Sequence, residues 1–424
     1  MLYALIAIMG LGVVDSYFIS YLGTVELAAI GFIVPITQIV TSFGLGLGMA
    51  VSSLVSKLIG ANKTSDAASV VTNGVYLTFG LSLITIIALI WQLKPIFMLV
   101  GADAQTMPAI MSYMHIWVLA VPAVIFTMVC SSTFRALGDT KTSASIAIIM
   151  TVSNMLLNPV FIFGFGPIPE LGIAGAAVAT LISVIFACII GGYQLIIRER
   201  LIELHLPSWT KFTSNVQSLL EIAIPAVLAN SVVPVIAATL TAIVAALGTD
   251  AVAGFGVGSR IEAMMLIVVY ALSSTLPMFI GQNLGAQKKE RVKEAIKIAF
   301  RFTLIFQLIL YVVLALLAAP IAAQFSDEES VQQTIILYLR IVPLAYGLSG
   351  IIILVNVSMN VLGKPKIALY INILRLVLLY APFAYIGSKL NGIIGFFVGI
   401  TIAHFFAYLM ATLWFNKTLK EIDI

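Results

Sequence analysis

Apolar runs of about 20 residues or more recur along the whole chain, with only short polar breaks between them. A run of that length crosses the hydrocarbon core of a bilayer as one helix. The residues are 61% hydrophobic and 9% charged, whereas about a quarter of the residues of a soluble domain are charged. We therefore expect a polytopic membrane protein that leaves no room for a soluble domain.

The runs predict an all-α fold of twelve transmembrane helices, because they are continuous and lack the period-2 alternation of an outer-membrane barrel. Gly and Pro, which end helices, fall in the breaks between the runs. The predicted helices span residues 1–22, 28–59, 67–93, 108–134, 142–164, 171–197, 218–247, 251–283, 292–320, 332–361, 367–387 and 392–415.

Basic residues predict the orientation of these helices, since Lys and Arg concentrate in cytoplasmic loops. The C-terminus and one alternate set of loops hold most of them, whereas the opposite set holds little more than Lys94 and Lys389. We expect a multi-pass protein of the cell (inner) membrane with both termini cytoplasmic. The net charge of +4 reflects this topology and predicts no nucleic-acid partner, and the run from Lys288 to Lys297 is expected to contact anionic membrane lipid.

The cysteines and histidines predict no metal site, cofactor or enzyme chemistry. Cys130 and Cys188 lie inside predicted helices, so no disulfide framework is expected. His115 and His404 are isolated, and His205 lies in a polar loop. Met1 opens directly in apolar sequence, so the first run is expected to be a retained helix and not a signal peptide; a start that lacks a few residues stays open.

The chain matches itself at a constant shift of 225 residues, which becomes 220 after residues 164–170. We predict an N-lobe of six helices over 1–197, a cytoplasmic linker over 198–217 that includes a short amphipathic segment from Leu201 to Trp209, and a C-lobe over 218–424. Two parallel repeats around a central site suit transport by alternating access, and a duplicated scaffold without a transport path is the alternative. Matching pairs include Gly23 with Gly248, Asn62 with Gln287, Tyr113 with Tyr338, Gly138 with Gly363, and Gly172 with Gly392.

Asp15 is a carboxylate inside the first apolar run, which contains no Lys, Arg or His. Desolvation without a cationic partner favours the neutral acid, so Asp15 is a candidate proton carrier. Asn154 and Asn158, one turn apart, and Thr180 lie at a similar depth, roughly 10 to 12 Å from the outer ends of their helices. These four residues are the predicted substrate or cation site. Two alternatives to a proton site stay open: these oxygen atoms could surround Na⁺ together with Asp15, or the asparagines could only pack the helices against each other.

The second half lacks this acid, because Leu240 stands at the position paired with Asp15. Coupling is therefore expected in one lobe only. The second half does contain Arg260 and Glu262, and Arg375 is a candidate partner of Glu262. We expect these three to be structural intramembrane charges, because a charge with a partner can be permanent.

The chain resembles the multidrug and toxic compound extrusion (MATE) family over essentially its whole length. The segments that carry the resemblance are Val14-Asp15-Ser16-Tyr17-Phe18, Leu27-Ala28-Ala29-Ile30-Gly31, Arg135-Ala136-Leu137-Gly138-Asp139-Thr140, Asn154-Met155-Leu156-Leu157-Asn158-Pro159, Gly172-Ile173-Ala174-Gly175-Ala176-Ala177, Arg260-Ile261-Glu262 and Ile280-Gly281-Gln282-Asn283-Leu284-Gly285-Ala286.

This resemblance implies a V-shaped exporter of cationic or amphiphilic drugs in exchange for H⁺ or Na⁺. The branch similar to DNA-damage-inducible transporters couples through an aspartate that Asp15 matches, and Asn154, Asn158 and Thr180 match its other polar positions. Asn158 replaces an acid that these relatives often carry, which weakens a Na⁺ site. The proline usual in the first helix is absent from residues 1–22. Another branch of the family couples through acids in two C-lobe helices. In this chain the span 218–247 has no acid beyond Glu221 at its start, and the span 332–361 has Asn356 and Asn360 but no acid.

The sequence therefore predicts a monomeric H⁺-coupled multidrug antiporter with Asp15 as the proton carrier. A Na⁺-coupled antiporter that uses the same site is one alternative. A flippase for lipid-linked precursors is another, which would require a cationic central cavity. Substrate identity is not encoded in any motif, because polyspecific sites are defined by shape and apolar lining.

Overall fold

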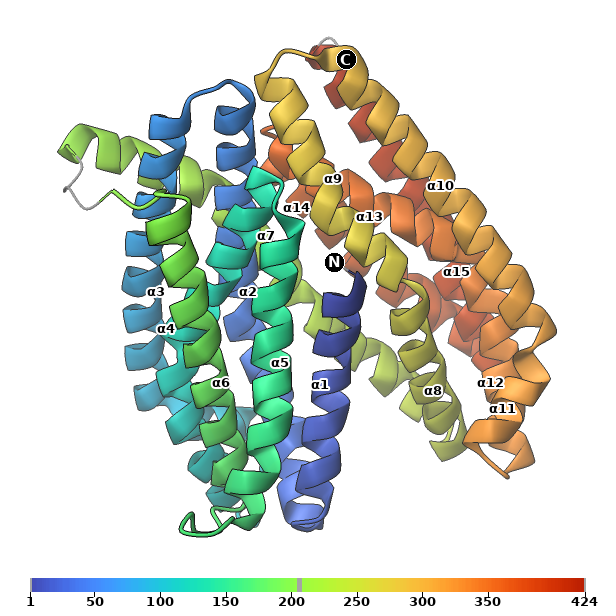
Figure 1. Cartoon of the computed structure of the whole chain (residues 1–424). Coiled ribbons are helices and arrows are strands. Elements are labelled where there is room, and N and C mark those ends of the chain that lie inside the picture. Colours follow the sequence, from blue (N-terminus) through green and yellow to red (C-terminus); the bar gives the residue numbers. More distant parts are fainter. Residues whose placement is uncertain (1, 204–207, 423–424) are drawn as a thin grey trace. The chain divides into compact units, whose positions relative to one another are not determined.

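The computed structural model describes residues 2–203 and 208–422, which are helical over most of their length (Figure 1). One antiparallel bridge joins Phe165 and Ile168, and the described ranges contain no strand. The predicted all-α class is confirmed. The contacts divide the chain into two units, Met1–Val227 and Leu228–Ile424, and each unit contains its own apolar core.

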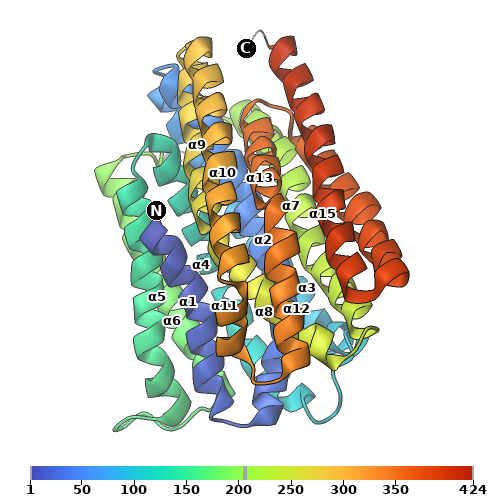
Figure 2. The ribbon, with the colours of Figure 1, turned by 90° about the vertical axis from the view of Figure 1, so that its right-hand side faces the viewer.

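Unit 1 contains six helices and the first part of a seventh. Figures 1 and 2 both show α1 lying along α5, its main neighbour in this unit. A short π-helical turn, η1 (Gln194–Arg198), extends α6. The helices of unit 1 are α1 (Leu2–Ser20), α2 (Thr24–Gly60), α3 (Thr64–Leu99), α4 (Met107–Leu137), α5 (Thr140–Phe163), α6 (Ile173–Tyr193) and the start of α7 (Trp209–Ala245).

Unit 2 contains the rest of α7 and a series of interrupted helices. Leu266 separates α8 (Thr249–Met265) from α9 (Ile267–Gly285), and Leu317 separates α10 (Lys289–Leu316) from α11 (Ala318–Phe325). A 3₁₀ turn, η2 (Val342–Ala345), joins α12 (Glu329–Ile341) to α13 (Tyr346–Val361). The π-helical η3 (Leu374–Tyr380) joins α14 (Pro365–Ile373) to α15 (Ala381–Glu421), which Asn391 and Gly392 interrupt with non-helical backbone.

Each of the twelve predicted spans overlaps a helix of the structure. Within the described residues, ten helical segments are long and apolar enough to cross a membrane, and one of them, Pro365–Glu421, covers the two spans predicted at 367–387 and 392–415. The chain is a multi-pass membrane protein. The span predicted at 251–283 is two helices, and Gln307 donates from Nε2 to the carbonyl of Met265 at their junction, at 3.1 Å.

Helix α7 begins at Trp209, nine residues before the predicted start of that span. Hydropathy marks only the part of a helix that lies in lipid, whereas the polar start of α7 is held by other contacts. Asn215 donates to Ser69 at 3.2 Å, and Lys211 pairs with Asp66 at 3.2 Å. The predicted segment from Leu201 to Trp209 and His205 fall wholly or partly on residues 204–207, outside the described residues.

The internal repeat extends to the backbone conformation of the turns. Gly172 (φ 56°, ψ −134°) and Gly392 (φ 52°, ψ −135°) have nearly the same dihedral angles. Asn62 and Gln287 both have φ 58°, a left-handed conformation that few residues other than glycine adopt. The residues of both pairs are 220 or 225 positions apart, so the duplicated sequence encodes duplicated turns.

Helices α2 and α4 approach closely in unit 1, and this contact fixes the position of α4. A Cβ atom on Gly44 would lie 2.6 Å from the sulfur of Met128, and one on Gly48 would lie 2.5 Å from the hydroxyl of Ser132. Both glycines are buried on α2. These two glycines of α2 therefore form a packing surface for α4.

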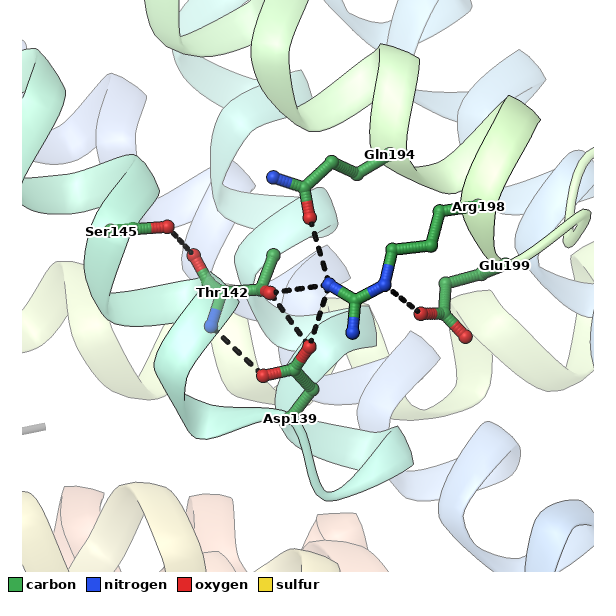
Figure 3. Close-up of polar contacts among 6 residues, drawn as sticks. All are labelled: Asp139, Thr142, Ser145, Gln194, Arg198 and Glu199. Atoms are coloured by element: carbon green, nitrogen blue, oxygen red, sulfur yellow. Dashed lines mark hydrogen bonds and ion pairs between the residues drawn. The ribbon is translucent and has the colours of Figure 1, made fainter.

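A polar network joins the start of α5 to the end of α6 (Figure 3). Asp139 caps α5 by accepting from the backbone N–H of Thr142 at 2.9 Å, and Arg198 pairs with Asp139 at 3.3 Å. Desolvation opposes ionisation of Asp139, but hydrogen bonds from Thr142 and the charge of Arg198 outweigh it and lower the pKa of this carboxyl. The contact stabilises the folded protein at pH values above the ordinary carboxyl pKa. This stabilisation is lost as the pH falls through the lowered pKa of Asp139.

We expect Gly175→Ala to destabilise the protein by about 1–3 kcal/mol, the usual cost of overpacking. An added Cβ would lie 2.2 Å from the carbonyl oxygen of Phe161, and backbone cannot move aside as a side chain can. Gly192→Ala, also in α6, is the matched control, because its Cβ would meet only the Phe126 ring at 3.6 Å. Thermal unfolding in detergent would measure both, and equal melting temperatures would contradict this packing argument.

Candidate functional site

The structure brings the four predicted site residues together in unit 1. Asp15 comes from α1, Asn154 and Asn158 from α5, and Thr180 from α6. Asn158 donates from Nδ2 to Oδ1 of Asp15 and lies 3.0 Å from Oδ1 of Asn154. Asn154 in turn lies 3.1 Å from the Thr180 hydroxyl. These contacts join α1, α5 and α6 through one chain of polar groups.

The spacing on α5 explains why both amides face Asp15. Asn154 and Asn158 are one helical turn apart, and Thr151 continues the same buried stripe of α5 one turn further from Asp15. Asn154 is 2% exposed and Asn158 is fully buried, whereas Asp15 is only partly buried. The two amides are therefore fixed by packing, whereas part of the Asp15 side chain remains accessible to solvent.

The amides can serve either protonation state of the acid. With its amide turned over, Asn154 donates to Oδ1 of Asp15 at 2.9 Å and accepts from the Thr180 hydroxyl at 3.1 Å. An amide presents both an acceptor oxygen and N–H donors, so it can donate to a carboxylate or accept from a neutral acid. Oδ1 of Asn158 is buried without a hydrogen-bond partner among the described residues.

Tyr113 of α4 is a further member of this cluster. It is buried, its side chain interacts with Thr180, and its hydroxyl is close enough to Asp15 to feel the charge of the carboxylate. Sequence reasoning did not assign Tyr113 to the site. The repeat pairs Tyr113 with Tyr338, but that Tyr338 contacts the carboxylate of unit 2 is seen only in the structure.

Asp15 has neutral neighbours. Among the residues that the structure describes, no Lys, Arg or His forms an ion pair with it. The same part of the chain contains no group of three His, Cys, Asp or Glu side chains that could hold a metal ion. The cluster can therefore exchange a proton, or present a few oxygen atoms around one carboxylate.

Unit 2 places its buried carboxylate differently. Glu262 of α8 accepts a hydrogen bond from the hydroxyl of Tyr338 of α12. Arg375 of η3 is close enough for electrostatic attraction to Glu262, but the two do not form a direct ion pair among the described contacts. Arg260 is exposed, on another side of α8. The nearest partner of Glu262 is thus a tyrosine, which the sequence analysis did not name.

His404 packs against a tyrosine in the folded chain. Its ring lies 4.5 Å, between centroids, from that of Tyr380, and its Nδ1 is 2.9 Å from the carbonyl oxygen of Ile400. The guanidinium carbon of Arg375 lies 6.0 Å from the centroid of the Tyr380 ring. Sequence spacing could not reveal the contact, because Tyr380 and His404 are 24 residues apart, on opposite sides of the interruption of α15 at Asn391 and Gly392.

Comparison with known proteins identifies the family. The MatE family model matches residues 1–160 and 225–386. A curated relative from Shewanella oneidensis, named FAD transporter, is 38% identical over 405 residues, which cover 95% of this chain and 89% of that protein. The probable multidrug resistance protein YpnP of Bacillus subtilis is 28% identical over 404 residues, with the same coverage.

Solved structures agree with these relatives. The crystal structure of the Vibrio cholerae MATE transporter VcmN in the bent form is 31% identical and superposes with a TM-score of 0.92, over 99% of this chain and 95% of that chain. A MOP superfamily transporter from Pyrococcus furiosus superposes with a TM-score of 0.91 at 21% identity, over 100% of this chain and 94% of that chain, which supports the fold alone.

We expect Tyr338→Phe to destabilise the protein by about 2 kcal/mol, because it removes a hydrogen bond to a buried charged group. Tyr370→Phe is the matched control, since that side chain is 53% exposed. Thermal unfolding in detergent would compare the two variants with the parent chain. A Tyr338→Phe melting temperature equal to that of the control would contradict a structural role for the Tyr338 contact.

Proposed function

This chain belongs to the MatE family of membrane transporters, and we propose that it exports cationic or amphiphilic small molecules in exchange for protons, with Asp15 as the proton carrier. The observation that carries the proposal is the set of partners around Asp15. Asn158, Asn154, Thr180 and Tyr113 are all neutral, so nothing in the described cluster holds the acid permanently ionised.

The neutral partners favour an acid that changes its protonation state during transport. An ionised Asp15 accepts from the amide N–H groups, and it attracts a cationic substrate. A proton neutralises the carboxylate, turns it into an O–H donor toward the amide oxygens and removes the attraction for the substrate. Substrate and proton then compete for one group, which is the requirement for exchange.

Sodium coupling at the same cluster is the closest alternative. The observation that favours it is the unpartnered Oδ1 of Asn158, which could complete an oxygen shell with Asp15 and Thr180. The cluster offers only one carboxylate among the described residues, and hard cations such as Na⁺ are held mainly by several oxygen ligands. We therefore prefer the proton, and imposed gradients separate the two ions.

We expect Asp15→Asn to abolish efflux driven by a pH gradient while the protein still folds, because an amide keeps the shape and hydrogen bonds of the acid but carries no exchangeable charge. Glu170→Gln is the matched control, since Glu170 is exposed in the turn before α6. Everted vesicles under a pH gradient alone, and under a Na⁺ gradient alone, provide the measurement. Efflux retained by Asp15→Asn would refute the assignment, and efflux driven only by Na⁺ would transfer it to sodium.

FAD is a second candidate substrate. The observation that favours it is the 38% identity with the FAD transporter of Shewanella oneidensis. FAD carries a pyrophosphate, so its recognition needs a cationic group, and Arg375 supplies a buried guanidinium whose Nε has no hydrogen-bond partner among the described residues.

Parallel uptake measurements into everted vesicles identify the substrate class. Fluorescent FAD and a fluorescent lipophilic cation, ethidium, would be tested under the same pH gradient, with Asp15→Asn as the inactive control. We expect ethidium to accumulate at least about tenfold over that control, a difference of about 1.4 kcal/mol. Accumulation of FAD without ethidium would replace the drug by the dinucleotide as substrate and leave the coupling proposal intact.

A further inference from the structure

Two buried threonines of unit 1 differ from their neighbours in how the hydroxyl is bonded. Thr72, Thr133 and Ser183 donate to the carbonyl four residues earlier, at 2.6 to 2.9 Å. Thr127 and Thr151 are 6% and 1% exposed, and neither hydroxyl has a hydrogen-bond partner among the described residues. A buried hydroxyl left unpaired costs about 1–3 kcal/mol, so a polar partner such as water is expected at both.

The two threonines lie at the same level of adjacent helices. Helices α4 and α5 are antiparallel neighbours joined only by Gly138 and Asp139. Their register is set near this turn, where Arg135 donates to Ser143 at 3.1 Å. Thr127 and Thr151 are each eight residues further from the turn than Arg135 and Ser143. Both therefore lie about 12 Å beyond that contact, at matched depth.

Both threonines are also on the side of their helices that faces the Asp15 cluster. Thr151 is three residues before Asn154 and seven before Asn158, on one buried stripe of α5. Thr127 is fourteen residues after Tyr113, which is two heptads and brings it back to nearly the same face of α4. Tyr113 interacts with Thr180 of α6, so α4 turns this face toward the cluster at that level, and α4 packs against both α5 and α6.

We propose that Thr151 and Thr127, bridged by water, form the next step of the proton path from Asp15 toward the α4–α5 turn, the end predicted to be cytoplasmic. This inference rests on the proposed function. Each hydroxyl accepts a proton on an oxygen lone pair and releases its own proton on the other side. Only O–H bonds form and break, and no charge remains on either threonine.

The side chains around Thr127 and Thr151 support a proton relay that uses only these two hydroxyls and water. Buried α4 residues near the same level, Ile125 and Val129, are apolar and offer no proton acceptor. Among the described side chains of α1, α4, α5 and α6, the titratable groups that are buried or partly buried are Asp15, Tyr113, Cys130, Arg135 and Cys188. Asp15 is the only carboxylate among them, so a proton that leaves it needs an intermediate hydroxyl or water.

The test compares valine and serine variants in proteoliposomes that contain a pH-sensitive dye, with proton release triggered by ethidium or by FAD, whichever is transported. We expect Thr151→Val and Thr127→Val each to slow proton release about tenfold, which corresponds to about 1.4 kcal/mol in the barrier. Thr151→Ser keeps the hydroxyl and should restore the rate. Thr133→Val is the control, because its hydroxyl is bonded within α4.

Two further readouts separate a relay from a structural role. Substrate affinity at fixed pH should be unchanged in both valine variants, and their transport rate should depend less steeply on pH. If both valine variants release protons at the wild-type rate while Asp15→Asn is inactive, the proposed relay is wrong but the proposed function stands. An active Asp15→Asn would instead remove the proposed function. If Thr151→Val does not fold, Thr127→Val and the serine variant decide the question.

Discussion

The hydrogen bonds between the Asp15 carboxylate and neutral amide groups determine what the first unit can do. A charge in an apolar medium usually requires an opposite charge nearby, and removal of a partner from such a pair is strongly destabilising. Asp15 has no such partner among the described residues. Its ionised form relies on N–H donors of Asn158 and, with its amide turned over, of Asn154, and an amide oxygen can accept from the neutral acid. The result is an acid that finds amide partners in both states, with a stronger hydrogen bond in the charged one.

The second unit repeats turns of the first but differs in chemistry. The turns at Gly172 and Gly392 have nearly the same conformation, and the paired tyrosines have different partners, since Tyr338 donates to Glu262 whereas Tyr113 interacts with Thr180. The position that corresponds to Asp15 is Leu240, which is buried. Glu262 instead accepts a hydrogen bond from Tyr338 and lies within electrostatic range of the Arg375 guanidinium, whereas the described partners of Asp15 are all neutral. On the proposed mechanism, duplication supplied a common scaffold, and only the first unit has an acid free to exchange its proton.

The sequence predicted the elements far better than their contacts. Lengths of apolar sequence predicted twelve spans, and each overlaps a helix of the structure, because burial in lipid requires continuous hydrophobicity. The same signal could not place the start of α7, where polar residues of the helix bind Ser69 and Asp66. Depth along each predicted helix was sufficient to group Asp15, Asn154, Asn158 and Thr180. It could not identify Tyr113, Thr127 or Thr151, because hydropathy does not tell which side of a helix faces a neighbour.

On the proposed mechanism, protonation of Asp15 changes how α1 is held against α5. The polar contact between these two helices is the hydrogen bond from Asn158 to Asp15, and near the end of α1 the ring of Phe18 lies 6.4 Å from that of Phe163. Apolar ring packing does not change when a proton binds, whereas the hydrogen bond changes from a charged to a neutral one. The energy available to shift α1 against α5 therefore lies in that contact, and the aromatic pair is suited to act as the pivot.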